Sequence, residues 1–395
     1  MKIETKAVHK GDRKRSNVPG AFVPSSTPIY TATTYLYEET AKLDRVLGHE
    51  EEGFSYGRYD NPTRLGLEEL LRELEGGANA QVCSSGMAAL HLALLAALTD
   101  RRKSVLLPSA IYGSTVTLLQ QAFEPLGVEV NSVDVCDLAA VERKIAETKP
   151  GCVVMETISN PLLRMGDIDR VAELARAGSA ALIVDNTFAS PLLVRPMEHG
   201  ANMVVESLTK FLSGHGDVLG GVVVSDNEHA DVVRALARTL GPTLSPFESF
   251  LAMRGIKTFA LRVERQCANA CRVASWLESH PRISRVHYLG DPKHPDAAVV
   301  RKLLPEGLHG ALVAFEIRDA SKEDVLHFMD KLQLVVCGTS LGDVHSLMSY
   351  PVISSHREIA PKQRARLGIG DGLVRFSVGI EAVDDITADL DQALA

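Results

Sequence analysis

The sequence lacks the features that mark membrane, secreted, metal-binding and nucleic-acid-binding proteins. Its N-terminal stretch is polar and no later run reaches the roughly 18 apolar residues of a membrane span, so we expect a cytoplasmic protein without a membrane partner. Its six cysteines contain no CxxC pair and its histidines have no metal-ligand spacing, which argues against a disulfide framework and a metal site. Lysine and arginine are scattered and the net charge is −8, so we expect no nucleic-acid partner.

Three segments with different patterns follow one another along the 395 residues. Residues 1–60 show little periodicity and are rich in Pro, Ser, Thr and Tyr, which is typical of an extended arm that needs a surface to lie on. In residues 61–254, Val-rich runs alternate with helical segments, which predicts a largely parallel sheet covered on both faces. Residues 255–395 combine long helical stretches with shorter strands and predict a smaller α/β domain. The strand candidates of the larger domain are 103–109, 128–134, 152–158, 180–186, 203–209 and 220–225.

Lys210 lies just past a Val-rich strand in the segment SLTKFLSGHGD. Partial burial at a strand end favours the unprotonated amine, which is the form that makes an imine with an aldehyde. Taken alone, a lysine after a strand is more often a solvated surface residue. The assignment therefore needs a second residue.

Asp185 supplies it, because it ends the most apolar strand of the chain in the segment AALIVDNTF. A carboxylate there needs a cation or a hydrogen-bond donor, so a structural cap and a ligand contact are both open. The protonated ring nitrogen of pyridoxal 5′-phosphate (PLP) would be such a cation, while Lys210 would hold the aldehyde carbon of the same ring. The carboxyl ends of neighbouring strands could bring the two side chains to one ring.

A phosphate cradle is predicted where the segment CSSGMAALHLALLAAL opens a strong helix. The backbone amides of Gly86 and Met87 would lie at its N-terminus, where the helix dipole favours an anion. An ordinary serine cap with a glycine turn is the alternative. Ser207 and Thr209 add hydroxyl groups from another strand end.

Tyr112 follows a strand in the segment SAIYGST and is expected to face the same crevice. Its ring could stack on a flat cofactor, and its phenol could donate or accept a proton. A buried structural tyrosine is the competing interpretation.

Together these segments resemble the Cys/Met metabolism family of PLP enzymes, the γ-family of the fold type I (aspartate aminotransferase-like) group. The resemblance covers nearly the whole chain, and it rests on the motifs YGRYDNPT, SSGMAA, ETISNP, VDNTF, SLTKFLSGHGD, MRGIKT, GTSLGD and LVRFSVGIE. It implies an α/β fold with a mostly parallel seven-stranded sheet in the large domain and a smaller C-terminal α/β domain. It also implies a homotetramer in which residues 1–60 contact a neighbouring subunit.

The resemblance further implies a role for each matching residue. Lys210 would bind the cofactor covalently and shuttle protons, Asp185 would hold the ring nitrogen, and Tyr112 would stack on the ring. Asn160 would contact the ring hydroxyl, and Arg375 with Ser340 beside it would clamp the substrate carboxylate. The phosphate would be bound by Gly86, Met87, Ser207 and Thr209, and by Tyr56 and Arg58 of a neighbouring subunit.

The reaction must be argued from substrate-facing positions, because members of this family share fold and cofactor. Family members that act on cystathionine commonly carry Glu where this chain has Thr339, and Thr339 with Asp343 resembles methionine γ-lyases. Ser114 stands where such lyases often have Cys, and His345 stands where Glu is common. We therefore expect a γ-lyase that splits methionine or a related thioether amino acid.

Two kinds of alternative remain. Within the family these are cystathionine γ-lyase activity and γ-replacement on an O-acylated homoserine. Outside it, a non-enzymatic nucleotide-binding α/β protein is disfavoured, since no G-x-x-x-x-G-K-S/T loop follows a strand.

Overall fold

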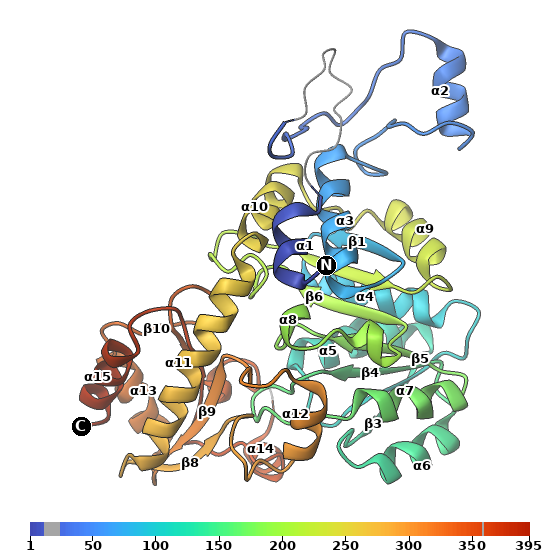
Figure 1. Ribbon diagram of the computed structural model, residues 1–395. Helices are drawn as coiled ribbons and strands as arrows, with labels where there is room; N and C mark the ends of the chain where they lie inside the picture. The colour runs from blue at the N-terminus through green and yellow to red at the C-terminus, as the bar shows by residue number, and fades with distance from the viewer. Residues whose placement is uncertain (12–23, 358) are drawn as a thin grey trace.

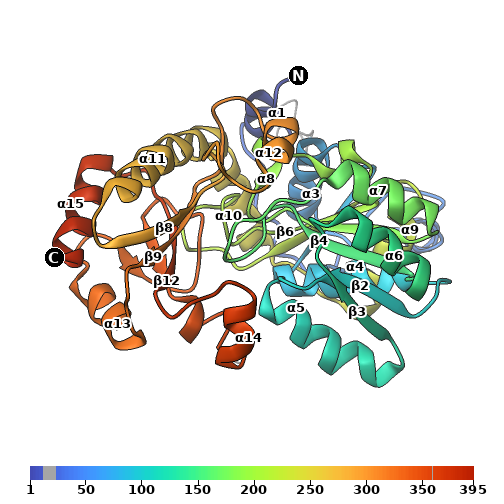
Figure 2. The same cartoon turned by 90° about the horizontal axis from the view of Figure 1, so that it is seen from below.

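The computed structural model describes residues 1–11, 24–357 and 359–395, and it contains two β-sheets (Figure 1). Seen from below, the two sheets with their helices form two lobes side by side (Figure 2). Among the described residues, no helix combines the length and the apolar character needed to cross a membrane.

The larger sheet has seven strands in the order β1-β7-β6-β5-β4-β2-β3. Neighbouring strands are parallel from β6 to β3, whereas β7 pairs antiparallel with both β6 and β1. The six strands predicted from the Val-rich runs are all present, and the mostly parallel seven-stranded sheet is confirmed. The bounds are β1 (Asn79–Cys83), β2 (Ser104–Pro108), β3 (Glu129–Val133), β4 (Cys152–Glu156), β5 (Ala181–Asp185), β6 (Met203–Ser207) and β7 (Gly221–Ser225).

Helices cover both faces of this sheet, because its central strands are apolar on both sides. On β5, Ala181 and Ile183 join the core formed with α4 (Gly86–Leu98) and α9 (Ala230–Leu240). Leu182 and Val184 of the same strand join the opposite core. That core includes α3 (Pro62–Glu75), α6 (Leu138–Thr148) and α7 (Ile168–Ala177). Further short helical segments here are α5 (Gly113–Leu118), Leu119–Phe123, Glu124–Leu126, α8 (Ser190–Leu193), Pro196–His199 and α10 (Pro246–Ile256).

The smaller sheet has five strands in the order β10-β11-β12-β9-β8 and its own hydrophobic core. The predicted long helix is α11 (Phe259–Ser279), and the acidic one is α15 (Val383–Leu394). We propose the boundary between the two domains at 254/255, in the last turn of α10 and shortly before α11 begins. The other elements are β8 (Ile283–His287), α12 (Ala297–Leu303), β9 (Leu312–Ile317), α13 (Lys322–Lys331), β10 (Val336–Cys337), β11 (Leu347–Ser349), Pro351–Ile353, α14 (Pro361–Arg366) and β12 (Leu373–Ser377).

The N-terminal segment is less extended than predicted. It contains α1 (Ile3–His9), which packs on α3 and α11 of its own chain, and α2 (Thr40–Leu47). Within the described residues of this segment, the part around α2 stands away from the body of the molecule (Figure 1). Within residues 1–60, α1 therefore belongs to the main core of its own chain, where its Ala7 is buried, and contact of this segment with a neighbouring subunit stays a proposal. Residues 12–23 lie outside the described part of the chain.

Candidate active site

The carboxyl ends of three neighbouring strands meet at the edge of the large sheet. Glu156 at the end of β4 pairs in register with Asp185 at the end of β5, and Asp185 pairs with Val205, two residues before the end of β6. A cavity of about 230 Å³ lies at these strand ends. Of the residues predicted from sequence, its lining contains Gly86, Met87, Tyr112, Asn160, Asp185, Ser207, Thr209, Lys210, Thr339 and Arg375.

Lys210 follows β6 directly, and its amine lies in this cavity. The Nζ atom donates a hydrogen bond to Oγ of Ser340 at 2.8 Å. Burial, together with the positive charge of Arg375, lowers the pKa of Lys210 to about 8. About a tenth of the amine is therefore unprotonated at pH 7, far more than for an ordinary lysine, and this is the form that attacks an aldehyde.

The loop that carries Ser340 lies directly against the Lys210 segment. Gly342 has φ +78°, and a Cβ atom there would lie 2.5 Å from the backbone nitrogen of Phe211. Its N–H donates to Oγ of Ser377 on β12. A glycine is required at this position both for its backbone conformation and for the close approach of the loop to the lysine.

Asp185 is a half-buried carboxyl that faces the cavity. Burial raises its pKa, and the interactions that oppose this shift come from Thr187, an uncharged residue. The N–H of Thr187 donates to Oδ1 of Asp185 at 3.0 Å. The described chain thus provides hydrogen bonds to this carboxyl, and a cation in the cavity would be the partner that stabilises its ionised form.

An anion cradle lies where α4 begins. Ser85 caps this helix by accepting the N–H of Ala88 at 3.1 Å, so the serine cap that we considered as an alternative is present. The amides of Gly86 and Met87 nevertheless lie at the N-terminus of a 13-residue helix on the cavity wall. A Cβ atom on Gly86 would lie 3.1 Å from Cβ of Ser207, so glycine lets the end of β6 approach this turn.

Glu156 is a cavity residue that our sequence reasoning missed. Its Oε1 accepts the N–H of Tyr112 at 2.9 Å, and its Oε2 accepts the N–H of Asn160 at 3.4 Å. Burial, reinforced by the neighbouring Asp185, raises the pKa of Glu156 to about 8. The signal was available, because Glu156 ends an apolar strand just as Asp185 does. Glu156 orients the backbone that presents the exposed ring of Tyr112.

Arg375 on β12 brings a buried cation from the smaller sheet to the cavity. Its Nη1 donates to Oδ1 of Asn160 at 2.9 Å, and its Nη2 donates to the carbonyl oxygen of Ser340 at 3.2 Å. Its Nε is buried without a hydrogen-bond partner among the described residues. Burial lowers the pKa of Arg375 to about 10. The guanidinium is therefore fixed from two sides and keeps N–H groups for a carboxylate.

A second, larger cavity of about 830 Å³ adjoins the first. Both cavities are lined by Tyr112, Asn160, Thr339 and Arg375, so these residues lie between the strand-end site and the outer space. Thr339 is a neutral side chain at this boundary. The outer cavity is where the distal part of a bound amino acid could extend.

Tyr56 and Arg58 are the two predicted site residues that the structure places elsewhere. They lie on an exposed turn ahead of α3, where a guanidinium N–H of Arg58 donates to the carbonyl oxygen of Arg238 on α9. The Arg58 guanidinium also lies 4.7 Å from the ring centre of Tyr59. Within one chain, these two side chains do not reach the cavity lining.

Asp226, Glu228 and His229 form the one cluster of potential metal ligands found among the described residues. These groups already contact protein partners: Nδ1 of His229 lies 2.8 Å from Asp226, and Glu228 pairs with Arg101 at 2.5 Å. The cluster lies apart from the cavity, and the expectation that the chain has no metal site stays a prediction.

The residues of the cavity fit PLP. The amine of Lys210 suits the aldehyde, and the half-buried carboxyl of Asp185 suits a protonated ring nitrogen. The amides at the start of α4, with the hydroxyl groups of Ser207 and Thr209, suit a phosphate. Each chemical feature of the cofactor has a complementary group on the cavity wall.

Comparisons with known proteins agree with this chemistry. The family model of the Cys/Met metabolism PLP-dependent enzymes matches residues 4–395. The chain is 38% identical over 392 residues to L-methionine gamma-lyase of Pseudomonas putida, which covers 99% of this chain and 96% of that protein. It is 37% identical over 369 residues to O-succinylhomoserine sulfhydrylase of Pseudomonas aeruginosa, which covers 93% of this chain and 90% of that protein.

A solved structure from Campylobacter jejuni matches all of this chain and all of its own with a TM-score of 0.91 at 29% identity, and it contains N′-pyridoxyl-lysine-5′-monophosphate. The family model and the curated relatives each span nine tenths or more of the sequence. The chain belongs to the Cys/Met metabolism family of PLP-dependent enzymes, as its motifs indicated.

Proposed function

We propose that the protein is a carbon–sulfur lyase that performs α,γ-elimination on methionine or a related thioether amino acid. The products are a thiol, 2-oxobutanoate and ammonia. The observation that carries the proposal is the neutral Thr339 at the boundary of the cavity, beside Arg375. A substrate whose side chain ends in an apolar thioether needs no charged partner at this boundary.

The residues of the chain divide the work as follows. Bound PLP supplies an electron-withdrawing ring that makes the α-carbon of an amino acid acidic. Lys210 moves protons at the α- and β-carbons of the substrate, since its amine is partly unprotonated near neutral pH. Tyr112 donates a proton to the departing sulfur, and Arg375 holds the carboxylate. Ser340 orients the lysine amine through its hydroxyl group.

The roles proposed for the cofactor contacts follow from their positions. Asp185 holds the ring nitrogen, Tyr112 stacks on the ring and Asn160 contacts the ring hydroxyl. Gly86, Met87, Ser207 and Thr209 bind the phosphate. Asn160 also fixes Arg375, so one amide links the cofactor contact to the carboxylate clamp.

We further propose that Tyr56 and Arg58 complete the phosphate site of a neighbouring subunit in a homotetramer. The turn that carries them is exposed and turned away from the cavity of its own chain. The adjacent segment has apolar side chains in solvent, with Leu36 91% exposed and Leu47 53% exposed. Such exposure in a single chain is typical of a surface that another subunit covers.

Gamma-replacement on an O-acylated homoserine is the second candidate, and the outer cavity favours it. That cavity is lined by hydroxyl groups, including those of Ser349, Ser354 and Ser355, and by Arg357. A polar or anionic acyl group could be bound there.

The deciding experiment supplies the PLP-loaded protein with L-methionine and, separately, with O-acetyl- or O-succinylhomoserine plus cysteine or sulfide. Release of 2-oxobutanoate and a thiol from methionine is expected. Rapid thioether formation from the acylated homoserines, with no keto acid from methionine, would overturn the proposed lyase in favour of replacement.

A further inference from the structure

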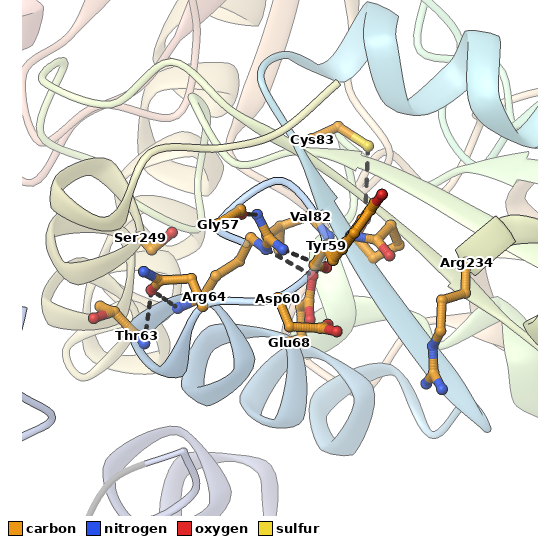
Figure 3. A network of polar contacts seen from close by, with 12 residues as sticks. Gly57, Tyr59, Asp60, Thr63, Arg64, Glu68, Val82, Cys83, Arg234 and Ser249 are labelled. Atoms are coloured by element: carbon orange, nitrogen blue, oxygen red, sulfur yellow. Dashed lines mark hydrogen bonds and ion pairs between the residues drawn. The ribbon is translucent and has the colours of Figure 1, made fainter. Parts of the chain in front are cut away.

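Arg64, in the first turn of α3, is a cation inside the protein. Its side chain is 2% exposed, and its two terminal nitrogens donate to backbone carbonyl oxygens. Nη1 reaches the carbonyl of Gly57 at 3.0 Å, and Nη2 reaches that of Tyr59 at 2.8 Å. Figure 3 shows the side chain extending from α3 to both residues. One planar group thus holds the carbonyl groups of the two residues that flank Arg58.

The network around Arg64 is anchored in the large sheet. Glu68, one helical turn later, lies 3.7 Å from Nε of Arg64. Its Oε1 also accepts hydrogen bonds from Nε2 of Gln81 at 2.9 Å and from the N–H of Val82 at 3.1 Å, both on β1 (Figure 3). Arg64 and Glu68 of α3 therefore connect the turn at residues 57–59 to strand β1.

Burying a guanidinium destabilises the folded state unless its N–H groups find hydrogen-bond acceptors. Here two of these hydrogen bonds go to a single turn. That turn itself lies on the surface: Arg58 is exposed, although it contacts Arg238 and Tyr59, and Tyr56 is 46% exposed. The N–H of Gly57 donates to the carbonyl of Thr33 at 2.7 Å, so the turn also carries the segment that stands away from the body. The interior thus holds rigidly a turn whose side chains face outward.

The chain uses the same device at the cavity itself. Arg262 on α11 is 5% exposed, and it donates to the carbonyl oxygens of Phe211 at 2.9 Å and Leu212 at 3.0 Å. These two residues directly follow Lys210. Arg262 therefore holds the segment of the reactive lysine within its own chain, and it provides a matched comparison for Arg64.

We propose that Arg64 is a positioning residue that acts in trans. By holding the carbonyl oxygens of Gly57 and Tyr59, it fixes the turn that presents Tyr56 and Arg58, and so sets how tightly a neighbouring copy of this chain retains the phosphate of its cofactor. This inference rests on the proposed role of Tyr56 and Arg58 at the neighbour's site. Arg262 has the corresponding role in cis.

The test combines two defective chains in one oligomer. R64K keeps the charge but loses the planar fork that reaches two carbonyls at once. Co-expression of an R64K chain with a differently tagged K210A chain gives hybrids, in which the intact Lys210 of the first chain faces the intact turn of the second. After gel filtration, borohydride fixes retained PLP on Lys210, and mass spectrometry measures the labelled fraction of each tagged chain.

In the R64K homo-oligomer, we expect the dissociation constant for PLP to rise by roughly tenfold or more, as for the loss of a hydrogen bond to a charged group. In the hybrid, labelling of the R64K chain should return to the wild-type level. A hybrid in which the R64K chain stays poorly labelled would overturn the proposal, and so would an R64K homo-oligomer that retains PLP like the wild type.

Two further hybrids separate the possible failures. R262K combined with K210A should show no recovery, because the defect stays on the chain that carries Lys210. R58A combined with K210A tests the underlying role in trans: recovery with R58A but not with R64K removes the inference about Arg64 alone. No recovery with R58A removes the proposed role of the turn itself. The readout is cofactor retention, so the identity of the substrate does not affect it.

The structural controls use the same helix. R72K changes an arginine of α3 whose side chain is 42% exposed, and it should retain PLP like the wild type. The R64K protein should keep the subunit number of R72K and remain folded at the assay temperature. If R64K does not fold, R64Q replaces it in the same hybrid, because its amide can still donate to one carbonyl.

Discussion

Replacing Arg375 by lysine gives the sharpest test of the substrate clamp. In the structure, Asn160 and the carbonyl of Ser340 hold one nitrogen each, and Nε remains free in a buried position. A lysine amine can keep the charge but cannot meet these two partners and also bind a carboxylate through two parallel bonds. Arg375→Lys therefore removes at least one charge-assisted hydrogen bond to the substrate.

Such a bond is worth about 1.5 to 3 kcal/mol. With about 1.4 kcal/mol for each factor of ten, KM for the amino-acid substrate should rise roughly 10- to 150-fold. Arg375→Ala, which removes the whole cation, should raise KM still further. The assay is steady-state release of 2-oxobutanoate from L-methionine by the PLP-loaded variants.

The matched control is a ligand without a carboxylate. The amine that corresponds to decarboxylated methionine should inhibit the wild type and Arg375→Lys with nearly equal inhibition constants, because it makes no contact with the guanidinium. An equal loss of affinity for this amine and for methionine would refute the assignment, since the substitution would then act on the cavity as a whole.

Other predictions concern the amine, its neighbours and the specificity position. PLP should recombine with the apoprotein faster as pH rises and level off above about pH 8, because the lowered pKa of Lys210 frees the amine there; a rate still climbing near pH 10 would contradict this. Asp185→Ala should weaken PLP retention and leave little turnover, and near-normal turnover would remove Asp185 from the ring nitrogen. Thr339→Glu should shift the ratio of kcat/KM values from methionine toward cystathionine, and an unchanged ratio would discredit the role of this position. Gly342→Ala should lower the unfolding temperature and slow turnover, because the added Cβ would lie 2.5 Å from the backbone nitrogen of Phe211; wild-type values for both would show that the loop can move away.

The sequence predicted the central part of the large sheet well, because its strands are continuous apolar runs. Lys210 and Asp185 could be found for the same reason, since a polar residue at the end of such a run is conspicuous. The strand Asn79–Cys83 was missed, because its five residues include polar Asn79 and Gln81 and resemble a loop before α4. The short helix α1 was missed in a segment whose composition indicated an arm.

The contacts that join distant parts of the chain could not be predicted. No local sequence pattern indicates that the hydroxyl of Ser340 contacts the amine of Lys210, because the two residues are 130 positions apart. The burial of Arg64 could not be predicted either, because a lone arginine in a helix is normally solvated. Its burial follows from how the preceding turn folds back over α3, which no spacing rule describes.

The close packing of the Gly342 loop on the lysine segment divides the labour of the enzyme between its two lobes. The large sheet carries the groups suited to the vitamin, whereas the loop and β12 of the small sheet carry Thr339, Ser340 and Arg375, which we propose for binding the amino acid. Evolution could therefore exchange one class of amino acid for another by altering a few positions on that loop, without rebuilding the part that makes bond cleavage possible. Diversification of this kind needs only a boundary between two lobes that have separate hydrophobic cores.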